Sequence, residues 1–277
     1  MTGGNATYVY GVIAGSRRRA RRGRGLPGTG PVRLVELDGD LVAAVADAPL
    51  KLYGEDPLAR KLSDLEWVSR AAVAHESVLE SFVDAKAVVP MKLFTLFTSE
   101  ERAIGHLRAE RSRIAATARR VANHQEWGVR VALRALPAAR AAAPARAPGR
   151  QSESGTQFLS RKKADRDVAT ELAARAGETV DALFDRLTAR ASVSTRRPAN
   201  ELQGGGGRLL LDAAFLVQRS RAKSFGSAVA REARTLGRSG YAVTMNGPWP
   251  PYSFVDPGAP APRPVDPGTP APRTGEK

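Results

Sequence analysis

Short runs of apolar residues, rich in β-branched and aromatic types, predict five strands in the first half of the chain. These are Tyr8–Ala14, Val32–Leu37, Leu41–Ala46, Val88–Phe97 and Glu126–Leu133. Asp38-Gly39-Asp40 separates the second run from the third, and an Asp-Gly pair in that position is a strong hairpin signal. Val88–Phe97 is apolar at both alternating positions, so we expect that strand to be buried on both faces.

Apolar residues spaced three and four apart predict two helices among these strands. One begins at Ser63, with Glu66 completing a capping box, and the other begins at Thr98, with Glu101 in the same role. The inward residues are Leu65, Val68, Ala72, His75, Leu79 and Phe82 in the first helix, and Ala103, Ile104, Leu107, Ile114, Ala118 and Val121 in the second. We expect His75 to be half-buried and satisfied, because the sequence supplies no identifiable catalytic partner for it.

The second half of the chain begins with a long helical pattern over Phe158–Ala191. Its inward residues are Val168, Leu172, Ala176, Val180, Leu183 and Leu187. A strand follows at Leu209–Val217, then a helix over Arg219–Leu236 and a closing strand from Tyr241. We expect Asn246-Gly247-Pro248 to end that strand, because proline removes a ladder donor.

This order of elements predicts the α+β class, with two small domains of helices packed on an antiparallel or mixed sheet. Abrupt changes in composition suggest the boundaries between the parts of the chain. The prediction assigns an N-terminal α/β domain to 1–135 (with an Arg- and Gly-rich loop at 16–30), a flexible Ala/Pro/Arg linker to 136–157, a C-terminal α+β domain to 158–255 and a disordered Pro-rich tail to 256–277.

The chain is strongly basic, with a formal net charge of +15 and a pI of about 10.9. Such a charge favours acidic partners, including nucleic acid. Six arginines lie within residues 17–24, but no aromatic residues are interleaved there for base stacking, which weakens the interpretation of this loop as a nucleic-acid arm. Arginine in an Ala-, Gly- and Pro-rich background also arises from GC-rich coding.

Catalytic, metal and cofactor motifs are not found in the sequence. Cysteine is absent, and His75, His106 and His124 match no zinc-binding spacing. The glycines at 204–207 lack the Gly-Lys-Ser/Thr of a phosphate loop, so we expect a flexible turn there. We therefore predict no enzyme activity, cofactor, metal or small-molecule substrate. Without a signal peptide or a membrane-length apolar run, we expect the protein to stay in the cytoplasm.

Three aromatic residues, Trp249, Tyr252 and Phe254, lie within six positions of a proline-rich stretch that ends at Val255. Aromatics make up only 6% of the chain, so this is a local concentration. Two uses are open for these side chains: a structural clasp that packs the closing strand onto its own domain, or an exposed partner-binding patch. The clasp is favoured, because buried aromatics serve cores more often than partners.

This stretch, GPWPPYSFV, resembles the ending of the gas vesicle proteins of the F/L family (GvpF/GvpL). The family usually has Thr where Asn246 stands, and Gly247–Phe254 matches throughout. VPMKLFTLF resembles the family form L-P-L-R-F-G-T-V-F, with Lys92 in place of Arg and Phe94 in place of Gly. The E-W-x-V-x-V core beginning at Glu126 is also similar to the family.

The resemblance implies two α/β domains related to the ferredoxin-like arrangement, over nearly the whole chain. It also implies a function in gas vesicle formation, as a minor component or assembly factor associated with the vesicle. The expected partners are the hydrophobic, aggregation-prone shell protein and other gas vesicle proteins. The alternative is a basic nucleic-acid-binding protein, which rests on the net charge and the arginine loop.

Overall fold

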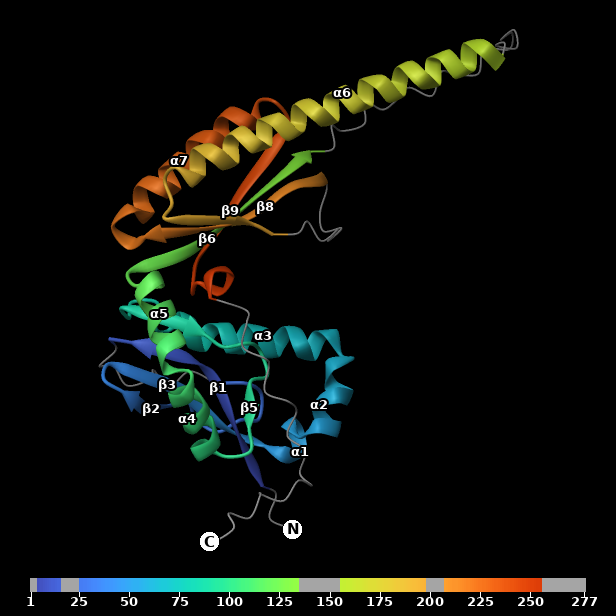
Figure 1. Cartoon of the computed structure of the whole chain (residues 1–277). Helices are drawn as coiled ribbons and strands as arrows, with labels where there is room; N and C mark the ends of the chain where they lie inside the picture. The colour runs from blue at the N-terminus through green and yellow to red at the C-terminus, as the bar shows by residue number, and fades with distance from the viewer. Residues whose placement is uncertain (1–3, 16–24, 135–154, 198–206, 256–277) are drawn as a thin grey trace, which may run out of the picture. The chain divides into compact units, whose positions relative to one another are not determined.

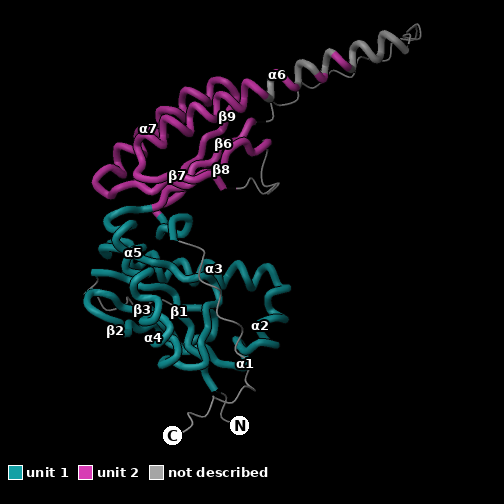
Figure 2. The backbone as a smooth tube through the Cα atoms, viewed as in Figure 1, with its two compact units in different colours: residues 1–125, 249–277 teal, residues 126–248 magenta. Residues whose placement is uncertain are grey.

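The computed structural model describes residues 4–15, 25–134, 155–197 and 207–255 (Figure 1). The chain forms two compact units (Figure 2). Unit 1 contains residues 1–125 and 249–277, and unit 2 contains residues 126–248. Unit 1 is therefore built from two stretches that are far apart in the sequence.

Unit 1 is a mainly antiparallel sheet covered by helices. Its elements are β1 (Asn5–Ala14), β2 (Arg33–Asp38), β3 (Leu41–Pro49), α1 (Leu50–Tyr53), α2 (Glu55–Leu62), α3 (Leu65–Glu80), β4 (Ala87–Pro90), β5 (Leu96–Phe97), α4 (Glu100–Ala109), α5 (Arg111–Val121) and the 3₁₀ turn η2 (Tyr252–Phe254). The strand order is β2-β3-β1-β4, and β5 also pairs with β1. The predicted hairpin joins β2 to β3, with Gly39 at φ 63°, where glycine carries no steric penalty.

The central strand β1 is buried on both faces, so helices cover both sides of the sheet. Tyr8 and Tyr10 share a core with Ala46, with the Trp67–Leu79 side of α3 and with Phe82 just after that helix. Helix α4 lies against the opposite face, since Glu100 bonds Arg33, which also pairs with Asp47. Asp47 is in register with Thr7. Thr7 precedes Tyr8 in β1, so their side chains point to opposite faces of the sheet.

Several boundaries in unit 1 differ from the sequence expectation. Helix α3 is capped by Asp64, whose side chain accepts from two backbone amides, and not by Ser63. Helix α4 is capped by Ser99, one residue after the predicted start at Thr98. Leu65 is 82% exposed and does not join the predicted inward stripe, because the helix turns Trp67 toward the core instead.

The Val88–Phe97 run forms two strands rather than one. β4 and β5 both pair with β1, and the residues between them leave the ladder. Phe94 takes a positive φ of 64° there, which interrupts an extended strand. The inward residues predicted for the second helix are all buried, although two helices, α4 and α5, carry them.

Unit 2 is a four-stranded sheet with two helices. Its elements are β6 (His124–Arg134), α6 (Gly155–Thr188), β7 (Val193–Arg196), β8 (Gly207–Gln218), the 3₁₀ turn η1 (Arg219–Arg221), α7 (Ala222–Gly237) and β9 (Tyr241–Trp249). The strand order is β7-β8-β6-β9. Its core joins both helices to one sheet face through Val129, Val131, Val180, Leu183, Leu187, Phe215, Val217, Phe225 and Val229, among others.

The predicted α+β class, with helices on two antiparallel sheets and a long helix in the second half, is confirmed. The division of the chain differs from the expected one. β6 was placed in the first domain, but it lies inside the sheet of unit 2, so the boundary falls near residue 125 rather than 135. β9 continues through Pro248 to Trp249, because an edge strand tolerates a missing donor.

Four predicted segments fall wholly or mainly outside the described residues. They are the arginine-rich part of the 16–30 loop, most of the 136–157 linker, the glycine turn and the Pro-rich tail. These predictions stay predictions.

Candidate functional site

The closing segment, residues 249–255, belongs to unit 1. Pro250 and Pro251 are buried, and the backbone amide of Tyr252 donates to the Pro250 carbonyl at 2.8 Å. Phe254 is 9% exposed, and its carbonyl oxygen accepts a 2.7 Å hydrogen bond from the Arg120 guanidinium of α5. A proline-stiffened segment of this kind loses little entropy when it becomes ordered.

The three predicted aromatics occupy different environments. Phe254 is buried, Tyr252 is partly buried against the core of unit 1, and Trp249 is half-buried at the end of β9. The clasp interpretation places all three on the second domain, and the patch interpretation leaves them exposed. The structure instead groups them with unit 1, because the chain returns there after β9.

Tyr252 lies beside a cluster of buried aromatic and histidine rings. Its ring centroid is 6.5 Å from that of His75, which stacks on Tyr10 at 5.5 Å. The Tyr8 hydroxyl and His75 Nδ1 are 2.7 Å apart. Strand β1, helix α3 and the closing segment therefore meet in one ring cluster.

Burial holds the groups of this cluster in their neutral forms. Desolvation lowers the pKa of His75 to about 4, although a backbone contact with Met91 opposes the shift. Burial also raises the pKa of Tyr8 well above its usual value and raises that of Tyr10. At neutral pH the Tyr8–His75 contact joins two uncharged groups. A general base needs a pKa nearer neutrality, so this geometry favours a structural role for His75.

Phe94 combines a strained backbone with an aromatic stack. Its ring is stacked on Trp67 at 5.5 Å with an interplanar angle of 6°. Its backbone amide donates to the Tyr8 hydroxyl at 3.2 Å. A positive φ at a residue with a Cβ costs free energy, and the stack and hydrogen bond offset that cost.

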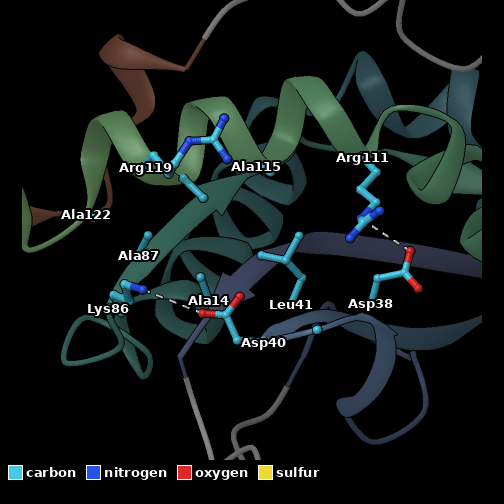
Figure 3. A pocket seen from close by; sticks show the side chains of 12 residues that line it. Ala14, Asp38, Asp40, Leu41, Lys86, Ala87, Arg111, Ala115, Arg119 and Ala122 are labelled. Carbon is cyan, nitrogen blue, oxygen red and sulfur yellow. Dashed lines mark ion pairs between the residues drawn. The ribbon is translucent and has the colours of Figure 1, made fainter.

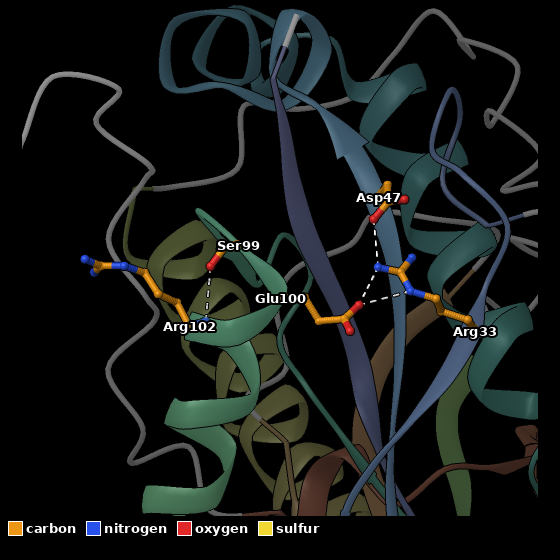
Figure 4. Close-up of polar contacts among 5 residues, drawn as sticks. All are labelled: Arg33, Asp47, Ser99, Glu100 and Arg102. Carbon is orange, nitrogen blue, oxygen red and sulfur yellow. Dashed lines mark hydrogen bonds and ion pairs between the residues drawn. The ribbon is translucent and has the colours of Figure 1, made fainter. Parts of the chain in front are cut away.

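A second polar cluster joins β2, β3 and α4 (Figure 4). Arg33 Nη2 is 2.8 Å from Asp47 Oδ1 and 2.5 Å from Glu100 Oε2, and Arg33 Nε also donates to Glu100. Next to it, the Ser99 hydroxyl caps α4 by accepting from the Arg102 amide. The two carboxylates neutralise the charge of the Arg33 guanidinium. Because they come from β3 and α4, the ion pairs hold that helix on the sheet.

Unit 2 carries a charged cluster on the sheet face that its helices leave free. Arg197 Nη2 is 3.3 Å from Glu126 Oε1, and Arg130 Nε is 3.0 Å from Asp212 Oδ2. Strand alternation puts no Phe, Tyr or Trp of β6 or β8 on this face. Among the described residues, these two strands therefore offer no aromatic ring on this face for a base to stack on.

Within the described ranges, no group of three or more His, Cys, Asp or Glu side chains is arranged to hold a metal ion. In the same part of the chain, no helix is long and apolar enough to cross a membrane.

Most of this environment could not be predicted from the sequence. Tyr252 and His75 are far apart in the chain, and no sequence pattern indicates that Tyr252 lies beside His75. Arg120 was also missed, because a contact across 134 residues leaves no local pattern.

Two antiparallel sheets, each packed with helices, define a two-unit α+β protein. A family model described as Gas vesicle synthesis protein GvpL/GvpF matches residues 6–256. The chain therefore belongs to the GvpL/GvpF family, a structural gas vesicle protein family, and its role is an accessory one associated with gas vesicles.

Individual relatives agree with this membership. The chain is 30% identical to gas vesicle protein L of Streptomyces sp., with 89% of this chain and 91% of that protein covered. It is 29% identical to gas vesicle protein F of Streptomyces sp., with 91% and 100% covered. The crystal structure of GvpF from Anabaena sp. has a TM-score of 0.66 at 17% identity, with 91% and 96% covered, and so shares the fold.

Proposed function

We propose that this protein is an assembly factor that binds the hydrophobic shell protein in the cytoplasm while the gas-filled shell is formed. The observation that carries the proposal is the family match over residues 6–256. The match includes both units and the closing segment, so the whole fold is shared with the family and not a single module.

The physical chemistry of the two units supports a binding role. The described surface exposes several large apolar side chains, such as Leu62, Leu65 and Val73, on a chain of high net charge. High net charge keeps a protein apart from its own copies. A charged protein that binds an apolar subunit can therefore keep that subunit from aggregating before it joins the shell.

The closing segment has a structural role in this proposal. Phe254 is buried, Tyr252 packs against the core of unit 1, and Trp249 is half-buried. We therefore assign the segment to holding the fold of unit 1, a clasp on the other unit from the one expected, and not to a three-residue patch for the shell protein.

Co-expression of the tagged full-length chain with the shell protein tests the proposal. We expect the shell protein to co-purify, and to stay in the soluble fraction more than it does when expressed alone. A matched experiment replaces the chain with an unrelated basic protein of similar net charge, which should not retain the shell protein.

Failure of the shell protein to co-purify from a well-folded chain would overturn the proposal. Binding to random DNA with a steep salt dependence would instead support the nucleic-acid alternative, because phosphate contacts release counterions.

A further inference from the structure

A groove of about 370 Å³ opens on unit 1 beside helix α5 (Figure 3). Its apolar lining consists of small side chains and one leucine: Ala14, Leu41, Ala87, Ala115, Ala118 and Ala122. Alanine walls let another backbone approach closely, because no long side chain fills the space. The volume lies near the lower end of the range for ligand sites, which suits a few small side chains.

Charged residues form the rim of the groove. Asp38 and Asp40 lie on the β2–β3 turn, opposite Arg111 of α5 and Lys86 before β4 (Figure 3). Arg111 Nε is 3.5 Å from Asp38, and Lys86 Nζ is 3.7 Å from Asp40. All four side chains are largely exposed, so both ion pairs are weak and can open to a competing group.

Arg119 is the third cation of the rim. Asp38 and Asp40 pair with Arg111 and Lys86 and not with Arg119. Among the residues that the structure describes, Arg119 has no ion-pair partner, and it lines the groove from α5 with its guanidinium beside the helix (Figure 3). The lining thus holds three cations and two carboxylates. The charge complement of the groove is therefore an anion.

We propose that this groove binds an acidic peptide segment with small apolar side chains, carried by a protein partner. A carboxylate of the segment pairs with Arg119, and its alanine-sized side chains fill the space along α5. The identity of the partner, a gas vesicle protein, rests on the proposed function. The chemistry of the groove does not.

A peptide fits this site better than a nucleic acid does. Asp38 and Asp40 would repel a row of phosphates, whereas one carboxylate can sit beside Arg119 without meeting them. The lining also has no aromatic ring on which a base could stack. Electrostatic complementarity of this kind gives specificity more than raw affinity.

The absence of cysteine from the chain makes a site-specific test straightforward. Ala115→Cys places a thiol in the groove, and Ala116→Cys places one on the exposed side of the same helix. The probe is a synthetic alanine-rich peptide with a single Glu, and the readout is the rate of iodoacetamide alkylation in the full-length protein. At about ten times its Kd, the peptide should slow alkylation about tenfold at position 115 and leave position 116 unchanged.

Charge variants test the role of Arg119. In the Ala115→Cys background, Arg119→Glu should weaken peptide binding by about tenfold or more, as expected for loss of a charge pair. Arg113→Glu makes the same charge change on the same helix outside the groove, and it should alter binding less than about twofold. Circular dichroism confirms that each variant is folded.

Several outcomes would overturn the proposal. One is equal protection at both cysteines, and another is an equal effect of the two charge variants. A third is protection by the peptide with Gln in place of Glu that is as strong as protection by the Glu peptide. The last is stronger protection by a single-stranded DNA of the same length. The peptide experiment contains no shell protein, so its failure and failure of the co-purification experiment are separate results.

Discussion

His75 and Phe94 show what the core of unit 1 demands of single residues. His75 is 4% exposed, and its pKa is lowered to about 4 because burial penalises the charged imidazolium. Phe94 stays at φ 64° while its ring stacks on Trp67. Burying a titratable ring at His75 and holding a positive φ at Phe94 each cost free energy, and the surrounding packing offsets that cost. A substitution at each position can therefore measure the cost separately from the packing.

Stability should fall as the pH is lowered through the titration of His75. The unfolded chain has a His pKa of about 6.5, so between that value and 4 it binds more protons than the folded chain. The neutral histidine therefore contributes fully above about pH 6.5, and about 3 kcal/mol is lost as the pH falls to 4. Urea denaturation at a series of pH values measures this loss.

His75→Gln is the matched control, because glutamine keeps a polar group near Tyr8 but does not titrate. Its unfolding free energy should depend less steeply on pH between 7 and 4 than that of the natural chain. Equal slopes for the two proteins would show that His75 is not the group responsible.

At Phe94, glycine should be tolerated better than alanine. Both substitutions remove the ring stacked on Trp67, but only glycine relieves the positive φ. We expect Phe94→Gly to be about 1 kcal/mol more stable than Phe94→Ala, although less stable than the natural chain. Denaturant midpoints of the three proteins give the order, and a more stable alanine variant would contradict it.

At the scale of elements, the sheets and helices could be predicted largely from local patterns. The β2–β3 hairpin follows from Asp38-Gly39, and the buried residues of α4 and α5 follow from their spacing. The partner of each strand could not be predicted. β6 has an ordinary strand pattern, and nothing in it indicates pairing with β8 and β9 of unit 2 rather than with strands that precede it.

The ring cluster was beyond prediction for the same reason. Tyr8, His75 and Tyr252 come from three distant positions, and their meeting depends on the folded path of the whole chain. The strain at Phe94 was signalled in part, because the resembling family has Gly there. The groove left no signal, since its lining comes from β1, the β2–β3 hairpin, β4 and α5, which are far apart in the sequence.

The turn between β2 and β3 should be sensitive to loss of its glycine. Gly39 has a φ of 63°, so Gly39→Ala should destabilise the protein by about 1 kcal/mol even though open space surrounds the position. Gly105→Ala is the matched change within helix α4, also in open space, and it should stabilise by up to about 1 kcal/mol. Thermal unfolding of both variants distinguishes backbone strain from crowding.

In the closing segment, Phe254 should matter more to stability than Trp249. Phe254 is 9% exposed, so Phe254→Ala should cost about 3 kcal/mol, near the lower end for a buried aromatic. Trp249 is half-buried, and Trp249→Ala should cost less. Melting curves give the order, and co-purification with the shell protein should survive in the Trp249 variant.

At the scale of the molecule, the two units differ in how the chain builds them. Unit 2 is one continuous stretch, whereas unit 1 takes residues from both ends of the chain. The segment that completes unit 1 is attached through Arg120, His75 and the core, and each of these contacts spans more than a hundred residues. Removing that segment should therefore lower the stability of unit 1, although the rest of unit 1 is still present.

A chain that ends at Pro248 should have a weakened unit 1 and a preserved unit 2. Trp67 reports on unit 1 and Trp127 on unit 2, so with Trp127→Phe, and with Trp249→Phe in every chain that contains residue 249, the fluorescence of Trp67 follows unit 1 alone. We expect its denaturant midpoint to drop in the truncated chain, because the contacts of Tyr252 and Phe254 are lost. A chain that ends at Val255 serves as the control and should unfold like the full-length protein.

The late position of the closing segment also orders events during synthesis. Domains usually fold from the N-terminus as they leave the ribosome. Here the first unit to emerge lacks Tyr252 and Phe254 until every strand of unit 2 has been translated. Contacts of such high sequence separation form slowly. Unit 1 is thus translated first but completed last. When translation stops before codon 249, the chain has residues 1–125 of unit 1 but lacks the segment that completes its core.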